Sequence, residues 1–80
     1  MSEHLKYLGR RQELEVEKKS LEIRIGGLIK NLRDELDPIK PVEDLRPEAV
    51  AAWSAELDAA KRRFGEVVAC LKQISDMIGR

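Results

Sequence analysis

The chain has 80 residues, of which 15 are Lys or Arg and 15 are Asp or Glu, so its formal net charge is zero. This balance argues against a uniformly basic nucleic-acid-binding protein and against an acidic disordered tail. An apolar content of 42% is too high for disorder, yet no apolar run approaches the roughly 20 residues of a membrane span. The start of the chain lacks a signal-peptide pattern, and its single cysteine cannot form an internal disulfide. We therefore expect one small cytoplasmic domain over residues 1–80.

The three prolines, Pro38, Pro41 and Pro47, divide the chain into two proline-free arms. Proline has no amide hydrogen for a helix interior, and the residue before it avoids the helical conformation. The sequence therefore predicts a helix over about 3–36, a proline-rich loop over 37–45 and a second helix over about 46–78. Asp44 is the expected N-cap of the second helix, and Pro47 is tolerated in its first turn.

The second arm carries the clearest periodicity in the chain. Its apolar residues alternate at spacings of three and four: Val50, Trp53, Leu57, Ala60, Phe64, Val67, Leu71, Ile74 and Ile78. This is the period of a left-handed coiled-coil seam, and it predicts one long helix that packs along a single partner helix.

The first arm is less regular. Its apolar stripe consists of Leu14, Leu21, Ile25, Leu28, Leu32 and Leu36, with Lys18 as an interruption and His4, Tyr7 and Arg11 on the same face toward the start. The pair Gly26-Gly27 lowers the helix propensity of this arm, but the many Leu, Glu, Lys and Arg residues around it favour one continuous helix. A kink at the glycines is the alternative.

Folding the arms back on each other brings residues level when their numbers add to roughly 82. Ile25 then meets Leu57, and Leu14 meets Val67 or Leu71. The glycine pair falls level with Trp53, and we interpret it as a notch for the indole rather than as a hinge. The predicted fold class is all-α, an antiparallel coiled-coil-like hairpin of two helices.

A hairpin of two helices leaves much apolar surface in water, which indicates association. Candidate residues for an oligomer interface lie outside the first seam: Leu5, Leu8, Val16 and Ile23 in the first arm, and Ala52, Ala59, Val68 and Met77 in the second. We expect a homo-oligomer, with an antiparallel dimer that forms a four-helix bundle as the favoured geometry. A partner protein helix is a second candidate occupant, and isolated apolar surface residues are the alternative explanation.

The charges are distributed unevenly along this hairpin. Residues 1–33 carry eight positive and five negative side chains, residues 34–58 two positive and eight negative, and residues 59–80 five positive and two negative. The loop end therefore carries −6 and the open end +6. An antiparallel pair of hairpins places each acidic end beside a basic end.

The chain shows no pattern that indicates catalysis. His4 and Cys70 have no second His or Cys at metal-ligand spacing, and no phosphate-binding or nucleophile motif is present. We predict no catalytic residues, no metal site, no cofactor and no membrane association. The leading hypothesis is therefore a non-enzymatic module for protein–protein interaction and self-assembly.

A second functional hypothesis rests on a basic band. The hairpin register brings five residues to one level: Lys18, Lys19, Lys61, Arg62 and Arg63. Such a band could follow a phosphate backbone, which would make the chain a small nucleic-acid-binding regulator. Carboxylates at helical spacing from these residues, such as Asp58 before Arg62, favour ordinary salt pairs instead.

Overall fold

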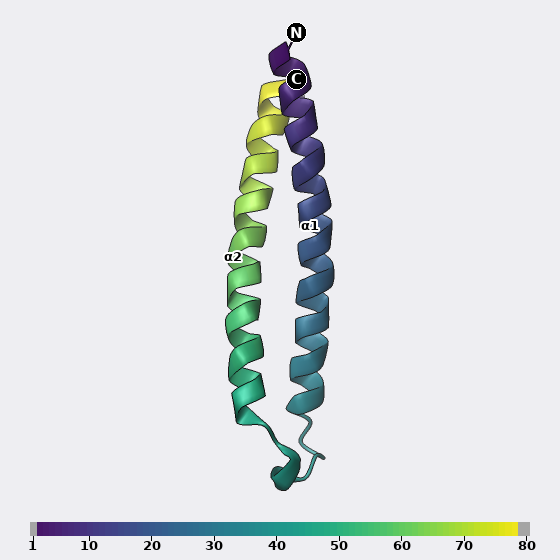
Figure 1. Ribbon diagram of the computed structural model, residues 1–80, viewed down its shortest axis with the longest axis vertical. Coiled ribbons are helices and arrows are strands. Elements are labelled where there is room, and N and C mark those ends of the chain that lie inside the picture. Colours follow the sequence, from purple (N-terminus) through teal and green to yellow (C-terminus); the bar gives the residue numbers. More distant parts are fainter. Residues whose placement is uncertain (1, 79–80) are drawn as a thin grey trace.

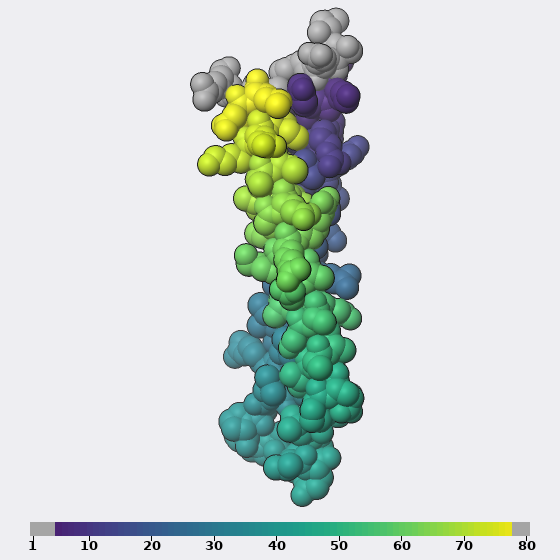
Figure 2. All heavy atoms as spheres, turned by 90° about the vertical axis from the view of Figure 1, so that its left-hand side faces the viewer, coloured from purple at the N-terminus to yellow at the C-terminus, as the bar shows by residue number. Residues whose placement is uncertain are grey.

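The computed structural model describes residues 2–78, with the side chains of residues 5–77. Helix α1 (Ser2–Glu35) and helix α2 (Pro47–Ile78) lie antiparallel and are joined by a loop that contains one short 3-10 helix, η1 (Val42–Asp44) (Figure 1). The result is a slender rod that measures 62 × 16 × 15 Å. Figure 2 shows α2 running along the whole visible face of this rod. The predicted all-α hairpin is confirmed, and each helix end lies within one residue of its expected position.

The core follows two series of residues spaced by seven. In α1 the series contains Tyr7, Leu14, Leu21, Leu28 and Glu35, and in α2 it contains Arg46 at the helix boundary followed by Trp53, Ala60, Val67 and Ile74. The numbers of level residues add to 81, close to the expected 82. Leu14 and Val67 are fully buried at the centre of the apolar cluster, and Tyr7 packs against the same cluster beside Ile74.

Local hydrogen bonds explain where each helix ends. After α1 the Asp37 carboxylate accepts the Ile39 amide at 2.9 Å, and the Asp37 carbonyl accepts the Lys40 amide at 3.0 Å, which closes a tight turn with Pro38 at its second position. The Arg46 carbonyl accepts the amides of Ala49 and Val50, so Arg46 is the N-cap residue of α2. Pro47 takes the first helical position, where its missing amide hydrogen leaves no gap in the helix hydrogen bonds.

The prediction that Asp44 caps α2 is wrong. Asp44 lies in η1, two residues before the N-cap, and its amide donates to the Pro41 carbonyl at 3.0 Å. The extra turn of 3-10 helix moves the start of α2 along the chain, because Pro47 with its fixed backbone angle sets the first helical residue.

The glycine notch is also wrong. α1 runs through Gly26 and Gly27 without a break, and a Cβ atom added to either residue would meet open space. The glycines lie at the expected level, but no atom of Trp53 comes within 4 Å of a Cβ atom built on either of them, and Gly26 lines a groove with Leu57 instead. The indole is half-buried in the seam, and the Arg46 guanidinium lies 5.8 Å from its ring centroid, within cation–π range.

The prediction that Leu36 belongs to the apolar stripe of the first helix is wrong. Its side chain is 56% exposed, whereas Glu35 beside it is buried. Glu35 comes seven residues after Leu28 and therefore points into the seam, while Leu36 is turned by about 100° from it.

Candidate interaction surface

One side of the hairpin is closed by ion pairs between the helices. Glu17 and Arg63 form two hydrogen bonds, one of them 2.8 Å from Arg63 Nη2 to Glu17 Oε1. Arg24 Nη2 lies 3.5 Å from Glu56 Oε2, seven residues closer to the loop on each helix. These four residues, which we call the closed side, flank the core at the buried Leu14, Ala60 and Val67 and the half-buried Leu21.

The closed side also shifts the pKa values of its groups. Hydrogen bonds from Arg63 lower the pKa of Glu17 below its usual value, and the hydrogen bonds to Glu17 and Glu66 raise the pKa of Arg63. Both groups therefore stay charged across the physiological pH range. Arg63 is tied down by two carboxylates, since Glu66 also lies 3.2 Å from its Nη1 atom.

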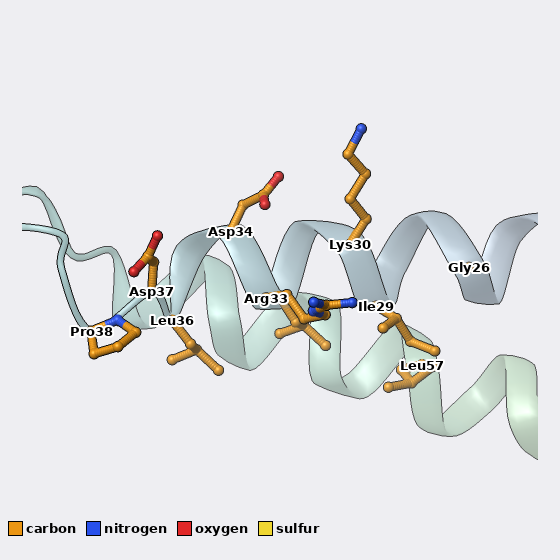
Figure 3. A pocket seen from close by; sticks show the side chains of 10 residues that line it. Gly26, Ile29, Lys30, Arg33, Asp34, Leu36, Asp37, Pro38 and Leu57 are labelled. Atoms are coloured by element: carbon orange, nitrogen blue, oxygen red, sulfur yellow. The ribbon is translucent and has the colours of Figure 1, made fainter.

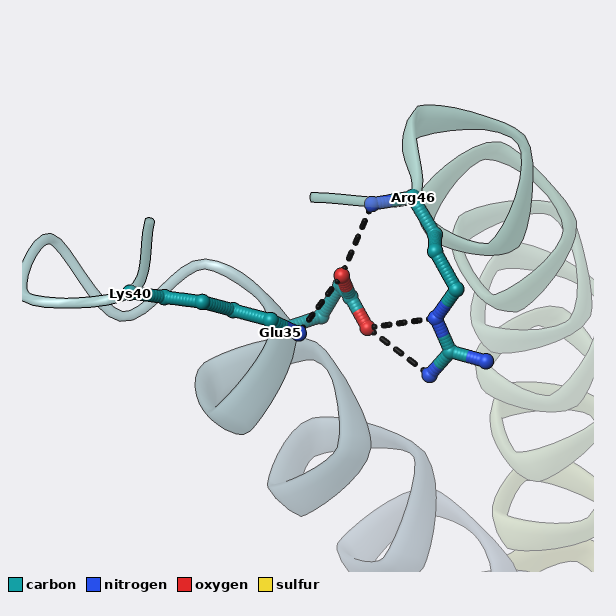
Figure 4. Close-up of polar contacts among 3 residues, drawn as sticks. All are labelled: Glu35, Lys40 and Arg46. Atoms are coloured by element: carbon teal, nitrogen blue, oxygen red, sulfur yellow. Dashed lines mark hydrogen bonds and ion pairs between the residues drawn. The ribbon is translucent and has the colours of Figure 1, made fainter. Parts of the chain in front are cut away.

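The loop end is held by a cluster that we call the loop clasp: Glu35, Lys40 and Arg46 (Figure 4). The Glu35 carboxylate accepts hydrogen bonds from Lys40 Nζ at 2.9 Å, the Arg46 amide at 2.8 Å, and Arg46 Nε and Nη2 at 3.2 and 2.9 Å. Only 2% of the Glu35 side chain is exposed. The hydrogen bond from Lys40, followed by that from the Arg46 amide, lowers the pKa of Glu35 to about 2.

The other side of the hairpin is open and apolar. The seam residues that alternate with the buried series are all half-buried: Ile25, Leu32, Val50, Leu57, Phe64 and Leu71. Four further residues lie next to them on this side: Leu8, Ile29, Leu36 and Val68. Each comes one residue after a member of the buried series, and one residue turns an α-helix by about 100°. The residues of the closed side come three residues after a member of the buried series, so they are turned about 60° in the opposite direction. We call these ten residues the open face.

A groove marks the loop half of the open face (Figure 3). It has a volume of about 760 Å³, and Ile29, Leu32, Leu36 and Leu57 form its apolar lining. Figure 3 shows Ile29 and Leu57 approaching each other between the helices, whereas Lys30 and Asp34 point away from α2. The groove can therefore accept an apolar side chain beside its aliphatic residues, with Arg33 as a charged neighbour in the lining.

The predicted interface residues lie on three different parts of the hairpin. Leu5, Val16 and Ile23 are 65%, 66% and 75% exposed and lie on the back of α1, away from α2; we call them the outer stripe. Leu8 and Val68 belong to the open face. Ala52, Ala59 and Met77 are exposed on α2, beside the closed side.

The predicted seam residues are all buried or half-buried where their side chains are described. Leu14, Leu28, Val67 and Ile74 are buried, and the others, Leu21, Ile25, Leu32, Val50, Trp53, Leu57, Phe64 and Leu71, are half-buried. The side chain of Ile78 lies outside the described residues, as does that of His4.

Two of the five residues of the predicted basic band, Arg62 and Arg63, pair with carboxylates. Arg62 lies 3.1 Å from Asp58, as its helical spacing indicated, and Arg63 binds Glu17 across the hairpin. Lys19 and Lys61 are exposed, and Lys18 is half-buried on the open face side of the seam. The nucleic-acid hypothesis stays a prediction.

Two features of the site were missed from the sequence: the buried Glu35, and the pairing of Glu17 with Arg63. The seven-residue spacing from Leu14 through Leu21 and Leu28 reaches Glu35, but a carboxylate does not fit an apolar pattern. The residue numbers of Glu17 and Arg63 add to 80, so the hairpin register could have placed these two residues side by side.

Among the described residues, no group of three or more His, Cys, Asp or Glu side chains could hold a metal ion, and neither helix is long and apolar enough to cross a membrane. Comparisons with protein-family models, with curated proteins and with solved structures found no match to this chain.

Proposed function

We propose that this protein is a non-enzymatic assembly module that binds helices on its open face and associates with itself into a four-helix bundle. The one-sided burial of the seam carries this proposal. Six members of one seam series are buried, namely Leu14, Leu28, Glu35, Ala60, Val67 and Ile74, whereas the described members of the alternating series are all only half-buried along the length of the rod. An apolar face of this kind on a hairpin is stabilised when another pair of helices covers it.

The position of the open face favours a bundle over a flat array of helices. In a four-helix bundle each helix contacts two neighbours through adjacent faces. The open face adjoins the intrachain seam on both helices, as such a bundle needs. The outer stripe lies on the opposite side of α1 from α2, so a partner bound there would leave the open face uncovered.

Light scattering over a series of micromolar protein concentrations tests the proposal. We expect the mass of a dimer for the unmodified protein. The double variant Ile29→Gln with Val68→Gln, on the open face, should shift the protein to a monomer while circular dichroism shows that the helices remain.

The chain offers a matched control on the outer stripe. Ile23→Gln with Val16→Gln changes the same two residue types and should leave the dimer intact. A monomer at all concentrations for the unmodified protein overturns the proposal. Dissociation by the outer-stripe pair alone assigns the interface to the back of α1 instead and contradicts the open face.

A further inference from the structure

The open face needs an occupant, and we infer that it is a second copy of this chain lying antiparallel, with Leu8 of each copy seated in the loop-end groove of the other. This inference rests on the proposed self-assembly and adds the orientation and the contact. Two observations support it: the distribution of charge and the level of Leu8 relative to the groove.

Charge favours the antiparallel orientation. Residue 23 lies level with residue 58, which divides the described rod into two halves. Residues 5–23 and 59–77 together carry nine positive and six negative side chains, whereas residues 24–58 carry five positive and eight negative. The open half of the rod is therefore +3 and the loop half −3. An antiparallel copy places opposite charges together, whereas a parallel copy places −3 on −3, and like charges brought together oppose association.

The groove lining does not set the orientation by itself. Its four charged residues, Lys30, Arg33, Asp34 and Asp37, cancel, so the groove accepts an apolar side chain of either end. The net charge of the whole end decides which end of the second copy comes close. Exposed charges act over about 8–10 Å at physiological salt, which is the spacing of packed helices.

Leu8 lies at the level that the groove requires. Two antiparallel copies bring residues of their α1 helices to the same level when the two residue numbers add to a fixed sum. This sum is roughly 37 if only the helices overlap and roughly 45 if the full rods overlap, at 1.5 Å per residue. Leu8 then lies level with Ile29 to Leu36 of the other copy. It follows Tyr7 in the buried series by one residue, so it belongs to the open face and is half-buried in the single hairpin.

The middle of the open face is polar but balanced. Glu15 and Glu22 flank the seam on α1, Lys61 flanks it on α2, and Lys18 interrupts it between them. Each copy therefore brings two acidic and two basic side chains to the centre of the interface. In the antiparallel register Glu15 of one copy lies level with Glu22 of the other, and the four charges of each copy cancel, so the middle of the face does not decide the orientation.

The size of the face fits a stable dimer. A rod 62 Å long and about 15–16 Å wide presents enough area for the roughly 800 Å² that each partner buries in an interface of standard size. The contact of two such faces covers both grooves at once, because the arrangement has two-fold symmetry.

A distance between spin labels tests the orientation. Asp76 is exposed near the open end, and Asp76→Cys in a Cys70→Ser background gives one label per chain. In the antiparallel dimer the two labels should lie roughly 40–55 Å apart along the bundle, at 1.5 Å per residue. In a parallel dimer they lie at one level and within roughly 30 Å.

A matched pair of leucine variants tests whether Leu8 binds in the groove of the other copy. Leu8→Gln should weaken the dimer at least tenfold in Kd, since burial of one leucine side chain is worth that factor or more. Leu5→Gln, on the outer stripe, should leave Kd unchanged.

The outcomes separate this inference from the proposed function. A dimer with the short label distance, or with Leu8→Gln of unchanged Kd, overturns the antiparallel seating and leaves self-assembly in place. A protein that is monomeric at all concentrations overturns both. A dimer with the long distance and a Leu8-specific loss supports the inference.

Discussion

The Glu35 carboxylate at the end of α1 accepts the backbone amide of Arg46, the N-cap residue of α2, at 2.8 Å. In a capping box this acceptor comes from a Glu or Gln of the same helix, three residues after the N-cap. Here that position is Ala49, which has no acceptor, and the preceding helix supplies the carboxylate instead. One side chain thereby joins the end of one helix to the beginning of the next.

Replacement of Glu35 by Gln should lower the stability of the hairpin. The amide side chain has nearly the same shape, but it removes the charge that Lys40 and Arg46 face and offers only one acceptor oxygen. We expect a lower midpoint of thermal unfolding, measured by circular dichroism. Glu43→Gln serves as the control because Glu43 is exposed and lies outside the open face, and an equal loss in both variants contradicts the role of the loop clasp.

Acid should weaken the hairpin in a defined range. The pKa of Glu35 is about 2 in the folded chain against an ordinary 4.5, and the pKa of Glu17 is also lowered. A lowered pKa stabilises the folded state above the ordinary value, and the stabilisation is lost as the pH falls from about 4.5 toward 2. Urea unfolding between pH 6 and 2 measures the free energy of unfolding of the unmodified protein and of Glu35→Gln, and the difference between the two should shrink over this range. A difference that stays constant would falsify the assignment of the effect to the carboxylate.

Truncation at the centre of the core should be costly. Leu14 is 1% exposed beside Val67, so Leu14→Ala should lower the free energy of unfolding by about 2–5 kcal/mol. Ile23→Ala, on the outer stripe, should change it by no more than about 0.5 kcal/mol. Both values are measured by urea unfolding at one protein concentration, because association contributes to apparent stability. Similar losses in the two variants contradict the described core.

Alanine at the glycine pair should stabilise α1. A Cβ atom at Gly26 or Gly27 meets open space, so each substitution should add about 0.5–1 kcal/mol through helix propensity alone. Gly65→Ala in α2 has the same free space and should behave alike. Destabilisation at Gly26 or Gly27, with a gain at Gly65, indicates that something packs against the glycine pair.

The fold could be predicted because its signals are local and repeated. The spacing from Val50 to Ile74 indicates one helix and one seam, and the prolines indicate the turn. The level of residues across the hairpin followed from the position of the loop. The side on which a residue lies was harder to predict, because one residue turns a helix by about 100°. Gly26-Gly27 was placed at the right level, but the pair does not receive the indole. Leu36 was predicted to lie in the seam, where the structure places its neighbour Glu35.

The candidate site was predictable only in part. The stripe from Leu5 to Ile23 was visible in the sequence, and three of its four residues, Leu5, Val16 and Ile23, are exposed, whereas Leu8 is half-buried on the open face. The open face was not, since its residues share the seam periodicity with those that are buried. The two sides of the seam differ only because Glu17, Arg24, Glu56 and Arg63 close one of them. Contacts between residues that are 32 and 46 positions apart decide this, and a periodicity within one arm does not contain them.

The loop clasp also bears on the order in which the chain folds. Glu35 and Arg46 are 11 residues apart, whereas Glu17 and Arg63 are 46 apart, so the clasp closes the shorter loop and loses less chain entropy. We expect the hairpin to nucleate at the loop and to grow toward the termini as a zipper. Loss of the clasp should then slow refolding, while loss of the Glu17–Arg63 pair should speed unfolding.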